Sequence, residues 1–116
     1  MIAAVARAEP GGVVFHCAGG RDRAGQIAML VLAVVGVAPE DIADDYELSA
    51  DRLRARHAAR SEEDEGALLD AFLAAQGTSA RQVILGTLAE LDVEAHLRAG
   101  GLTDGDLAAL RARFLA

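Results

Sequence analysis

V-V-F-H-C-A-G-G-R-D-R-A-G, residues 13–25, is the most informative stretch of the sequence. A short apolar run, V-V-F, is followed by His16 and Cys17, two glycines, three charged residues and a longer apolar run from Ile27. This order is typical of a buried strand, a tight loop and a helix. We therefore predict a strand over about residues 13–16 that leads into a loop and then a helix.

The predicted loop combines a nucleophile with the features of an anion site. Five residues separate Cys17 from Arg23, a spacing that allows both side chains to face one anion. Backbone N–H groups of such a loop form an anion-binding nest, and the next helix adds its positive N-terminal end. A cysteine there has a lowered pKa, because its thiolate is stabilised. Arg23 suits two phosphate oxygens, and Gly19 and Gly20 permit unusual backbone angles.

Each of these features alone has a plainer interpretation. A lone cysteine in an apolar stretch is most often an inert core residue, and paired glycines most often form a turn. Their combination at this spacing favours a phosphate-binding loop, as a motif hypothesis that the structural context has to support.

The loop resembles the H-C-x-x-G-x-x-R signature of cysteine-dependent phosphatases. It is more similar to the H-C-x-x-G-K-D-R-[TA]-G loop of a bacterial tyrosine phosphatase family that is lipid-phosphatase-like, with dual or triple specificity. The positions that carry the likeness are His16, Cys17, Gly20, Arg21, Asp22, Arg23, Ala24 and Gly25. Arg21 replaces the family's lysine and keeps its charge. Ala24 stands where many cysteine phosphatases have a hydroxyl that helps the thiolate leave.

The resemblance implies a role for each loop residue. Cys17 is expected to attack phosphorus, Arg23 to stabilise the phosphoryl oxygens, and Asp22 to supply the leaving group's proton. The alternative for Asp22 is an ion pair with Arg21 or with the arginines of residues 52–60. His16 is expected to be buried and to orient the loop, and Arg21 to contact a second phosphate or an acidic face of the substrate. The residues expected to bind the substrate's phosphate are His16, Ala18, Gly19, Gly20 and Arg21.

Composition limits the other functions to consider. The 116 residues carry a formal net charge of −7, which disfavours nucleic acid as a partner. Residues 27–37 form an apolar run too short for stable membrane insertion, and no signal peptide is evident. The single cysteine suits a reducing compartment, so we expect a cytoplasmic protein. His57 and His96 lack a second ligand at metal spacing, so we expect no metal site and no cofactor.

The rest of the chain is predicted to be helical. Helices are expected over residues 2–8, 24–35, 39–60 with a break near Ser49, 66–75, 80–91, 94–99, and from about 104 onward. We expect Ser79 with Gln82, and Thr103 with Asp106, to cap two of these helices. The residues expected to be buried in the helix over 66–75 are Leu68, Leu69, Phe72 and Leu73, and in the last helix Leu107, Leu110 and Phe114.

The fold class expected is therefore α/β but mostly α-helical. One strand precedes the loop, five or six helices follow it, and residues 1–116 form a single domain. The resemblance implies the C-terminal part of the cysteine-phosphatase fold, with the family's N-terminal half missing. A lone strand leaves both of its edges unpaired. We therefore expect either a homo-oligomer or a complementary segment that is missing from the chain.

Arginines at 52, 54, 56 and 60 leave two interpretations open. They belong either to a solvated, salt-bridged helix, which charge patterning favours, or to a positive rim for anionic substrates.

Three functions follow, in order of preference. The first is a cysteine-dependent phosphatase acting on phosphotyrosine or other phosphomonoesters of proteins or lipids, including phosphoinositides, through a phosphocysteine intermediate. The second is a non-catalytic phosphate-binding remnant, or one half of a split phosphatase. The third is a redox enzyme of the arsenate reductase kind, which needs thiols and strands that this sequence lacks.

Overall fold

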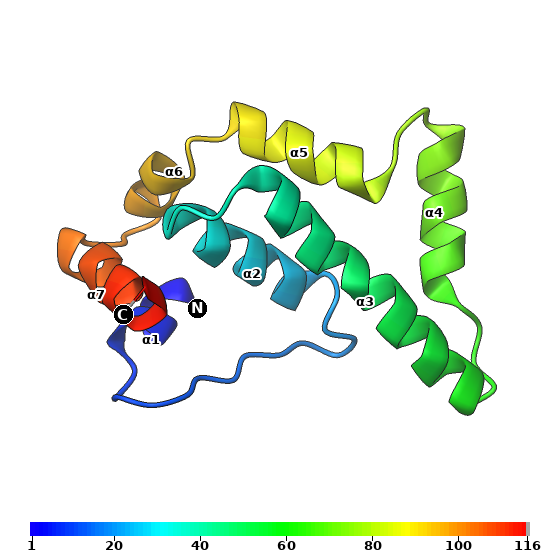
Figure 1. Ribbon diagram of the computed structural model, residues 1–116, viewed down its shortest axis with the longest axis horizontal. Helices are drawn as coiled ribbons and strands as arrows, with labels where there is room; N and C mark the ends of the chain where they lie inside the picture. Colours follow the sequence, from blue (N-terminus) through cyan, green and yellow to red (C-terminus); the bar gives the residue numbers. More distant parts are fainter. Residues whose placement is uncertain (116) are drawn as a thin grey trace. The chain divides into compact units, whose positions relative to one another are not determined.

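The computed structural model describes residues 1–115, and these residues form seven helices that divide between two compact units (Figure 1). The first unit joins Met1–Ala38 to the C-terminal segment from Leu91, and the second unit is Pro39–Glu90. The mostly helical character agrees with the sequence. The expectation of a single domain remains a prediction.

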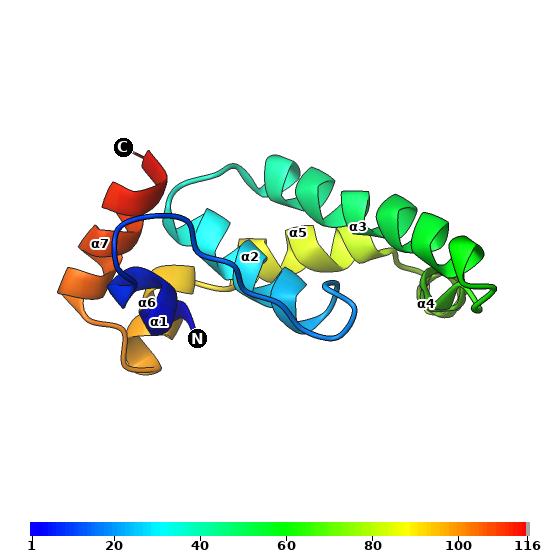
Figure 2. The same cartoon turned by 90° about the horizontal axis from the view of Figure 1, so that it is seen from below.

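The first unit is built from helices near both ends of the chain: α1 (Ile2–Arg7), α2 (Arg23–Val34), α6 (Val93–Ala99) and α7 (Asp104–Leu115). In Figures 1 and 2, α1 lies against α7, although about 100 residues separate them in sequence. Apolar side chains from all four helices and the loops between them form its core: Ile2, Val5, Ala6, Val31, Val34, Val35, Val93, Leu102, Leu107 and Leu110. Phe114, expected in this core, is 45% exposed.

A buried carboxylate ties α1 to α7. The Arg7 guanidinium donates to both carboxylate oxygens of Asp106, each at 2.8 Å, and Asp106 is 5% exposed. Thr103 and Asp106 also form the expected capping box, because each side chain accepts the other residue's backbone N–H at 3.1 Å. Arg7 and the Thr103 N–H hold the pKa of Asp106 far below its usual range.

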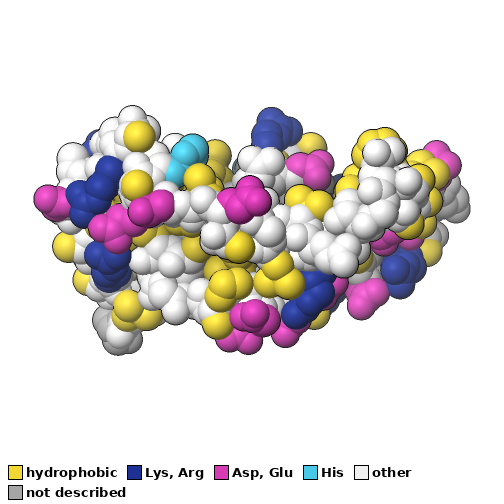
Figure 3. Space-filling view, turned by 90° about the horizontal axis from the view of Figure 1, so that it is seen from above, with side chains coloured by type: hydrophobic (Ala, Val, Ile, Leu, Met, Phe, Trp, Pro, Cys, Tyr) yellow, Lys and Arg dark blue, Asp and Glu magenta, His cyan; other side chains and the backbone are white. Residues whose placement is uncertain are grey.

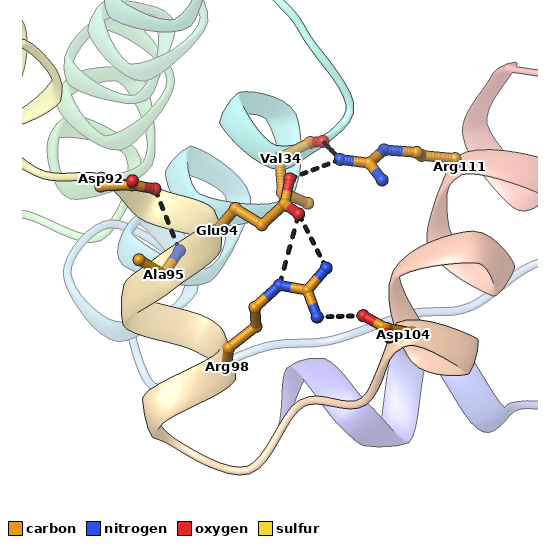
Figure 4. A network of polar contacts seen from close by, with 7 residues as sticks. All are labelled: Val34, Asp92, Glu94, Ala95, Arg98, Asp104 and Arg111. Atoms are coloured by element: carbon orange, nitrogen blue, oxygen red, sulfur yellow. Dashed lines mark hydrogen bonds and ion pairs between the residues drawn. The ribbon is translucent and has the colours of Figure 1, made fainter.

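A second polar network joins α2, α6 and α7 (Figure 4). Glu94 of α6 accepts from Arg98 on its own helix at 2.9 Å and from Arg111 of α7 at 2.8 Å, and these two arginines lower its pKa. Arg111 also reaches the backbone carbonyl of Val34 in α2, and Arg98 pairs with Asp104. Arg111 thus connects three helices of this unit, through Glu94 of α6 and the Val34 carbonyl of α2.

The second unit contains α3 (Pro39–Ala59), α4 (Glu65–Ala75) and α5 (Ala80–Glu90). The predicted break near Ser49 is wrong, because α3 continues through it. Ile42 and Ala43 of α3 and Ile84 of α5 are buried, and Arg81 of α5 binds two carboxylates of α3. The Ser79 hydroxyl accepts the Gln82 N–H at 3.2 Å, as expected for a capped α5.

Helix α4 exposes most of its apolar side chains. Leu68 and Phe72 are 54% and 61% exposed, and hydrophobic side chains reach the surface over α4 at the right of Figure 3. Gly66 is the one residue of α4 that is buried. The predicted burial of Leu68 and Phe72 is therefore wrong, because apolar spacing identifies a face that needs a neighbour without showing that a neighbour exists.

The predicted strand over residues 13–16 is also wrong, and with it the α/β fold class. Residues 12–17 have no regular secondary structure, and residues 1–115 contain no strand. Val14, which a buried strand would cover, is 90% exposed. A strand requires neighbouring strands to pair its backbone groups, and the described chain supplies none.

No helix in residues 1–115 is both long and apolar enough to cross a membrane.

Candidate functional site

The loop with Cys17 connects an irregular segment to the start of α2. Residues 12–17 lead into a series of bends over 18–22, and α2 begins at Arg23. Gly20 has φ +78°, in the left-handed region that side chains with a Cβ rarely adopt. This angle lets the backbone reverse direction and brings the Gly20 N–H back to Cys17.

Backbone amides converge on the Cys17 sulfur. The Gly20 N–H donates to Sγ at an N–S distance of 3.2 Å. The N–H of Ala24 is the largest cause of a lowered pKa for the thiol, and the amides of Gly20, Gly19 and Arg23 lower it further. Partial burial of the side chain opposes this shift. Because four N–H groups favour the negative form, the loop stabilises a thiolate.

Helix α2 contributes to stabilising the Cys17 thiolate, because the first N–H groups of a helix have no intrahelical acceptor. Asp22 is its N-cap residue, but within the described chain its carboxylate accepts no capping hydrogen bond. The amides of Arg23 and Ala24 act on Cys17 instead. The sequence indicated the positive end of this helix at the anion site but did not single out the Ala24 N–H. The helix start just after Asp22 was the signal for Ala24, since the first turn of any helix has unpaired N–H groups.

The other predicted site residues differ in their exposure. Ala18, Asp22 and Arg23 are exposed on the loop. Arg21 is only 8% exposed. Its expected contact with a second phosphate or an acidic face of the substrate remains a prediction.

His16 does not have the predicted environment. Its side chain is exposed, and the Nδ1 atom lies 3.4 Å from the backbone oxygen of Cys17, not close to the sulfur. The expectation of a buried imidazole followed from the predicted strand, which would have covered this position. Because the segment is irregular, the side chain reaches solvent.

The segment before the loop is held at its beginning by α7. The Arg113 guanidinium donates to the backbone carbonyls of Gly11 at 2.8 Å and Glu9 at 3.1 Å, and also to that of Ala8. The sequence did not single out Arg113. Its contacts are to backbone atoms about 100 residues away, so no local pattern indicates them.

Among residues 1–115, no cluster of three or more His, Cys, Asp or Glu side chains is arranged to hold a metal ion. The donors that the structure gathers at Cys17 are backbone N–H groups, which bind anions.

Two comparisons with known proteins found matches. The profile of a family described as the tyrosine phosphatase family matches residues 1–116. A tyrosine-protein phosphatase of Nostoc commune is 44% identical over 46 residues, which are 40% of this chain and 16% of that relative. The aligned stretch thus spans about one sixth of the relative's length. No solved structure shows significant similarity to the chain.

Proposed function

The chain belongs to the tyrosine phosphatase family, and from this we propose that it is a cysteine-dependent phosphatase with Cys17 as nucleophile. The observation that carries the proposal is the set of backbone amides around the Cys17 sulfur, which lowers the pKa of the thiol. A thiolate is the form that attacks phosphorus. We assign the loop to the H-C-x-x-G-K-D-R-[TA]-G signature, with Arg21 in place of lysine.

In the first step, the Cys17 thiolate attacks the phosphorus atom of a phosphomonoester. A P–S bond forms while the P–O bond to the leaving group breaks, which gives a phosphocysteine. Asp22 protonates the leaving oxygen, a role that its exposed position beside the loop permits. The amides of residues 18–24 and the Arg23 guanidinium stabilise the charge on the three equatorial oxygens.

In the second step, water attacks the phosphocysteine. The P–S bond breaks, inorganic phosphate leaves, and the thiolate is regenerated. The proton removed from water returns to Asp22, so the enzyme completes the cycle unchanged. Ala24 offers no hydroxyl to assist the departing sulfur, so the convergent amides are the groups available to stabilise it.

The proposed substrates are phosphorylated proteins, phosphotyrosine first, and other phosphomonoesters including phosphoinositides. We propose the cytoplasm as the compartment, since a single reactive thiol persists where thiols stay reduced. The correspondence of the chain to the C-terminal half of a family member remains a prediction.

Hydrolysis of p-nitrophenyl phosphate by the purified chain tests the proposal. We expect turnover that Cys17→Ser lowers by at least about 1,000-fold, because the hydroxyl of serine is not ionised. Calorimetry with inorganic phosphate should show that Cys17→Ser still binds the anion, whereas Arg23→Ala loses both binding and turnover. Arg81→Ala, which removes an arginine of α5 that pairs with Asp44 and Glu47, is the matched control and should change neither. Undiminished hydrolysis by Cys17→Ser would refute the proposal.

Ala24 also favours one alternative, a phosphate-binding module without turnover, because the hydroxyl that aids the second step is missing. A folded chain that binds inorganic phosphate in an Arg23-dependent manner, yet hydrolyses no aryl phosphate, would establish this alternative.

A further inference from the structure

One exposed face of α3 carries acidic and basic residues in a fixed order. We call it the mixed-charge face, and its members are Asp41, Asp45, Leu48, Arg52 and Arg56. Successive members are three or four residues apart, so at about 100° per residue they fall within an arc of about 80°. The face is acidic in the N-terminal half of the helix and basic in the C-terminal half, with one leucine between them.

All five side chains are exposed, and Leu48 is 57% exposed. Within the described chain, no ion pair involves any of the four charged members, although neighbouring residues on other sides of α3 are paired. Asp44 and Glu47 bind Arg81 at 2.6 and 2.9 Å, and Asp51 binds Arg54 at 3.0 Å. The mixed-charge face is thus free of partners within its own unit.

The remaining elements of the second unit meet α3 on a different side. Arg81 of α5 reaches Asp44 and Glu47, and Arg54 lies 3.5 Å from Asp64 at the start of α4. Figure 1 shows α5 running beside α3, with α4 near the C-terminal end of α3. From the helical repeat, these contact positions are centred roughly 130° from the mixed-charge face. A partner on that face meets neither α4 nor α5.

Stabilisation of the helix itself does not account for the whole pattern. Acidic residues favour a helix N-terminus and basic residues its C-terminus, but this effect is confined to the terminal turns. Asp41 belongs to the first turn of α3 and Arg56 to the last. Asp45 and Arg52 lie in the interior of the helix, where the macrodipole gives little preference for either sign.

We propose that the mixed-charge face binds a second copy of this chain, with the two α3 helices antiparallel. Place a two-fold axis beside Leu48. Asp45 of each copy then faces Arg52 of the second copy, and Asp41 faces Arg56. The two leucines meet at the axis, so the face is complementary to itself, as a symmetric dimer requires.

The order of the charges selects this occupant over others. An acidic peptide or an anionic surface would suit a face of one sign, but here it would be repelled by the acidic half. A parallel pairing of two copies would oppose like charges. An antiparallel copy matches both halves, and the contact, about 22 Å long, is short enough to be weak and salt-sensitive. This dimer does not depend on the proposed catalytic activity.

Two charge-reversed variants of the full chain provide the test. The first is Asp41→Arg with Asp45→Arg, which makes the face wholly basic, and the second is Arg52→Asp with Arg56→Asp, which makes it wholly acidic. Sedimentation velocity at low salt, over a range of concentrations, measures dimer formation. We expect the unchanged chain to dimerise and its dissociation constant to rise at least about tenfold at high salt. Each variant alone should be monomeric, and an equimolar mixture of the two should form dimers again.

Glu40→Arg with Glu62→Arg is the control for the basic variant. It makes the same change in net charge at exposed positions off the face, and Glu40 shares the first turn of α3 with Asp41. This control should dimerise like the unchanged chain, and circular dichroism should show that all variants keep their helix content. A chain that stays monomeric at low salt, a dimer that persists in both variants, or a mixture of the variants that does not associate would each overturn the proposal.

Discussion

The starts of α2 and α4 share a residue type and use it differently. Both helices have an aspartate at the N-cap. Asp64 accepts the N–H groups of Gly66 and Ala67 at 3.0 and 3.3 Å, whereas Asp22 accepts no capping bond in the described part of the chain. At α2 the unpaired N–H groups act on the sulfur of Cys17.

This difference in capping means that one helix start contributes to stability and the other to anion binding. At a capped helix start, the side chain of the N-cap residue accepts the first N–H groups, and the helix becomes more stable. An uncapped start leaves them for an anion, here the thiolate and in the proposed function a phosphate as well. The cap residue alone does not distinguish the two cases, because both are aspartate. What distinguishes them is the cysteine that the loop brings to α2.

Among variants that test this comparison, the largest effect is expected from replacing the two aspartates. Asp22→Ala should lower hydrolysis of an alkyl phosphate by about 100-fold or more, because the leaving oxygen loses its proton donor. It should change the free energy of unfolding by less than about 0.5 kcal/mol, since no capping bond is lost. Asp64→Ala should do the reverse: hydrolysis is unchanged, and the free energy of unfolding falls by about 1 kcal/mol because the cap is lost. Steady-state kinetics and urea unfolding measure the two quantities, and equal effects of the two variants on both would contradict the comparison.

A smaller effect is expected at two glycines with almost the same backbone angle. Gly20 has φ +78° in the loop, and Gly77 has φ +76° after α4; neither has an atom within 4 Å of an added Cβ. Alanine at either position should therefore introduce similar backbone strain and lower the free energy of unfolding, measured in urea, by about 1 kcal/mol. Only Gly20→Ala should slow hydrolysis, by about tenfold, because the strain moves an N–H away from the sulfur. Slowed hydrolysis by Gly77→Ala would show that activity follows stability and not loop geometry.

The smallest expected effect is a dependence of stability on pH. Since the pKa of Cys17 is lower in the folded chain than in the unfolded one, the thiolate contributes stability that is complete above the ordinary thiol pKa. This contribution disappears as the pH falls through the folded pKa. The melting temperature of the chain should therefore exceed that of Cys17→Ser by a margin that grows with pH across this window. A margin that is constant with pH would show that the amides do not stabilise the thiolate.

Local chemistry made several parts of the fold predictable. The capping pair Thr103 and Asp106 and the hydroxyl cap of Ser79 both form as expected, because these bonds join residues three apart in sequence. The approach of Gly20 to Cys17 follows from the same local logic, since a glycine with a positive φ lets a short loop turn back on itself.

Properties that depend on distant partners were not predictable. An apolar run such as residues 13–15 becomes a strand only where other strands pair with it, and Phe72 is buried only where another element covers it. The sequence shows which residues need a partner but not whether one is present. His16 is exposed because the segment before the loop is irregular, and the burial of Arg21 is not indicated by any local pattern of the loop.

The first unit takes its helices from both ends of the chain, while the second is a continuous segment inserted between them. During synthesis the second unit is complete before α6 and α7 exist. Arg113, which holds the backbone before the loop, and Asp106, which holds α1, are both made after the second unit. The loop with Cys17 is therefore translated before the residues of α7 that support it, and the whole second unit is made in between.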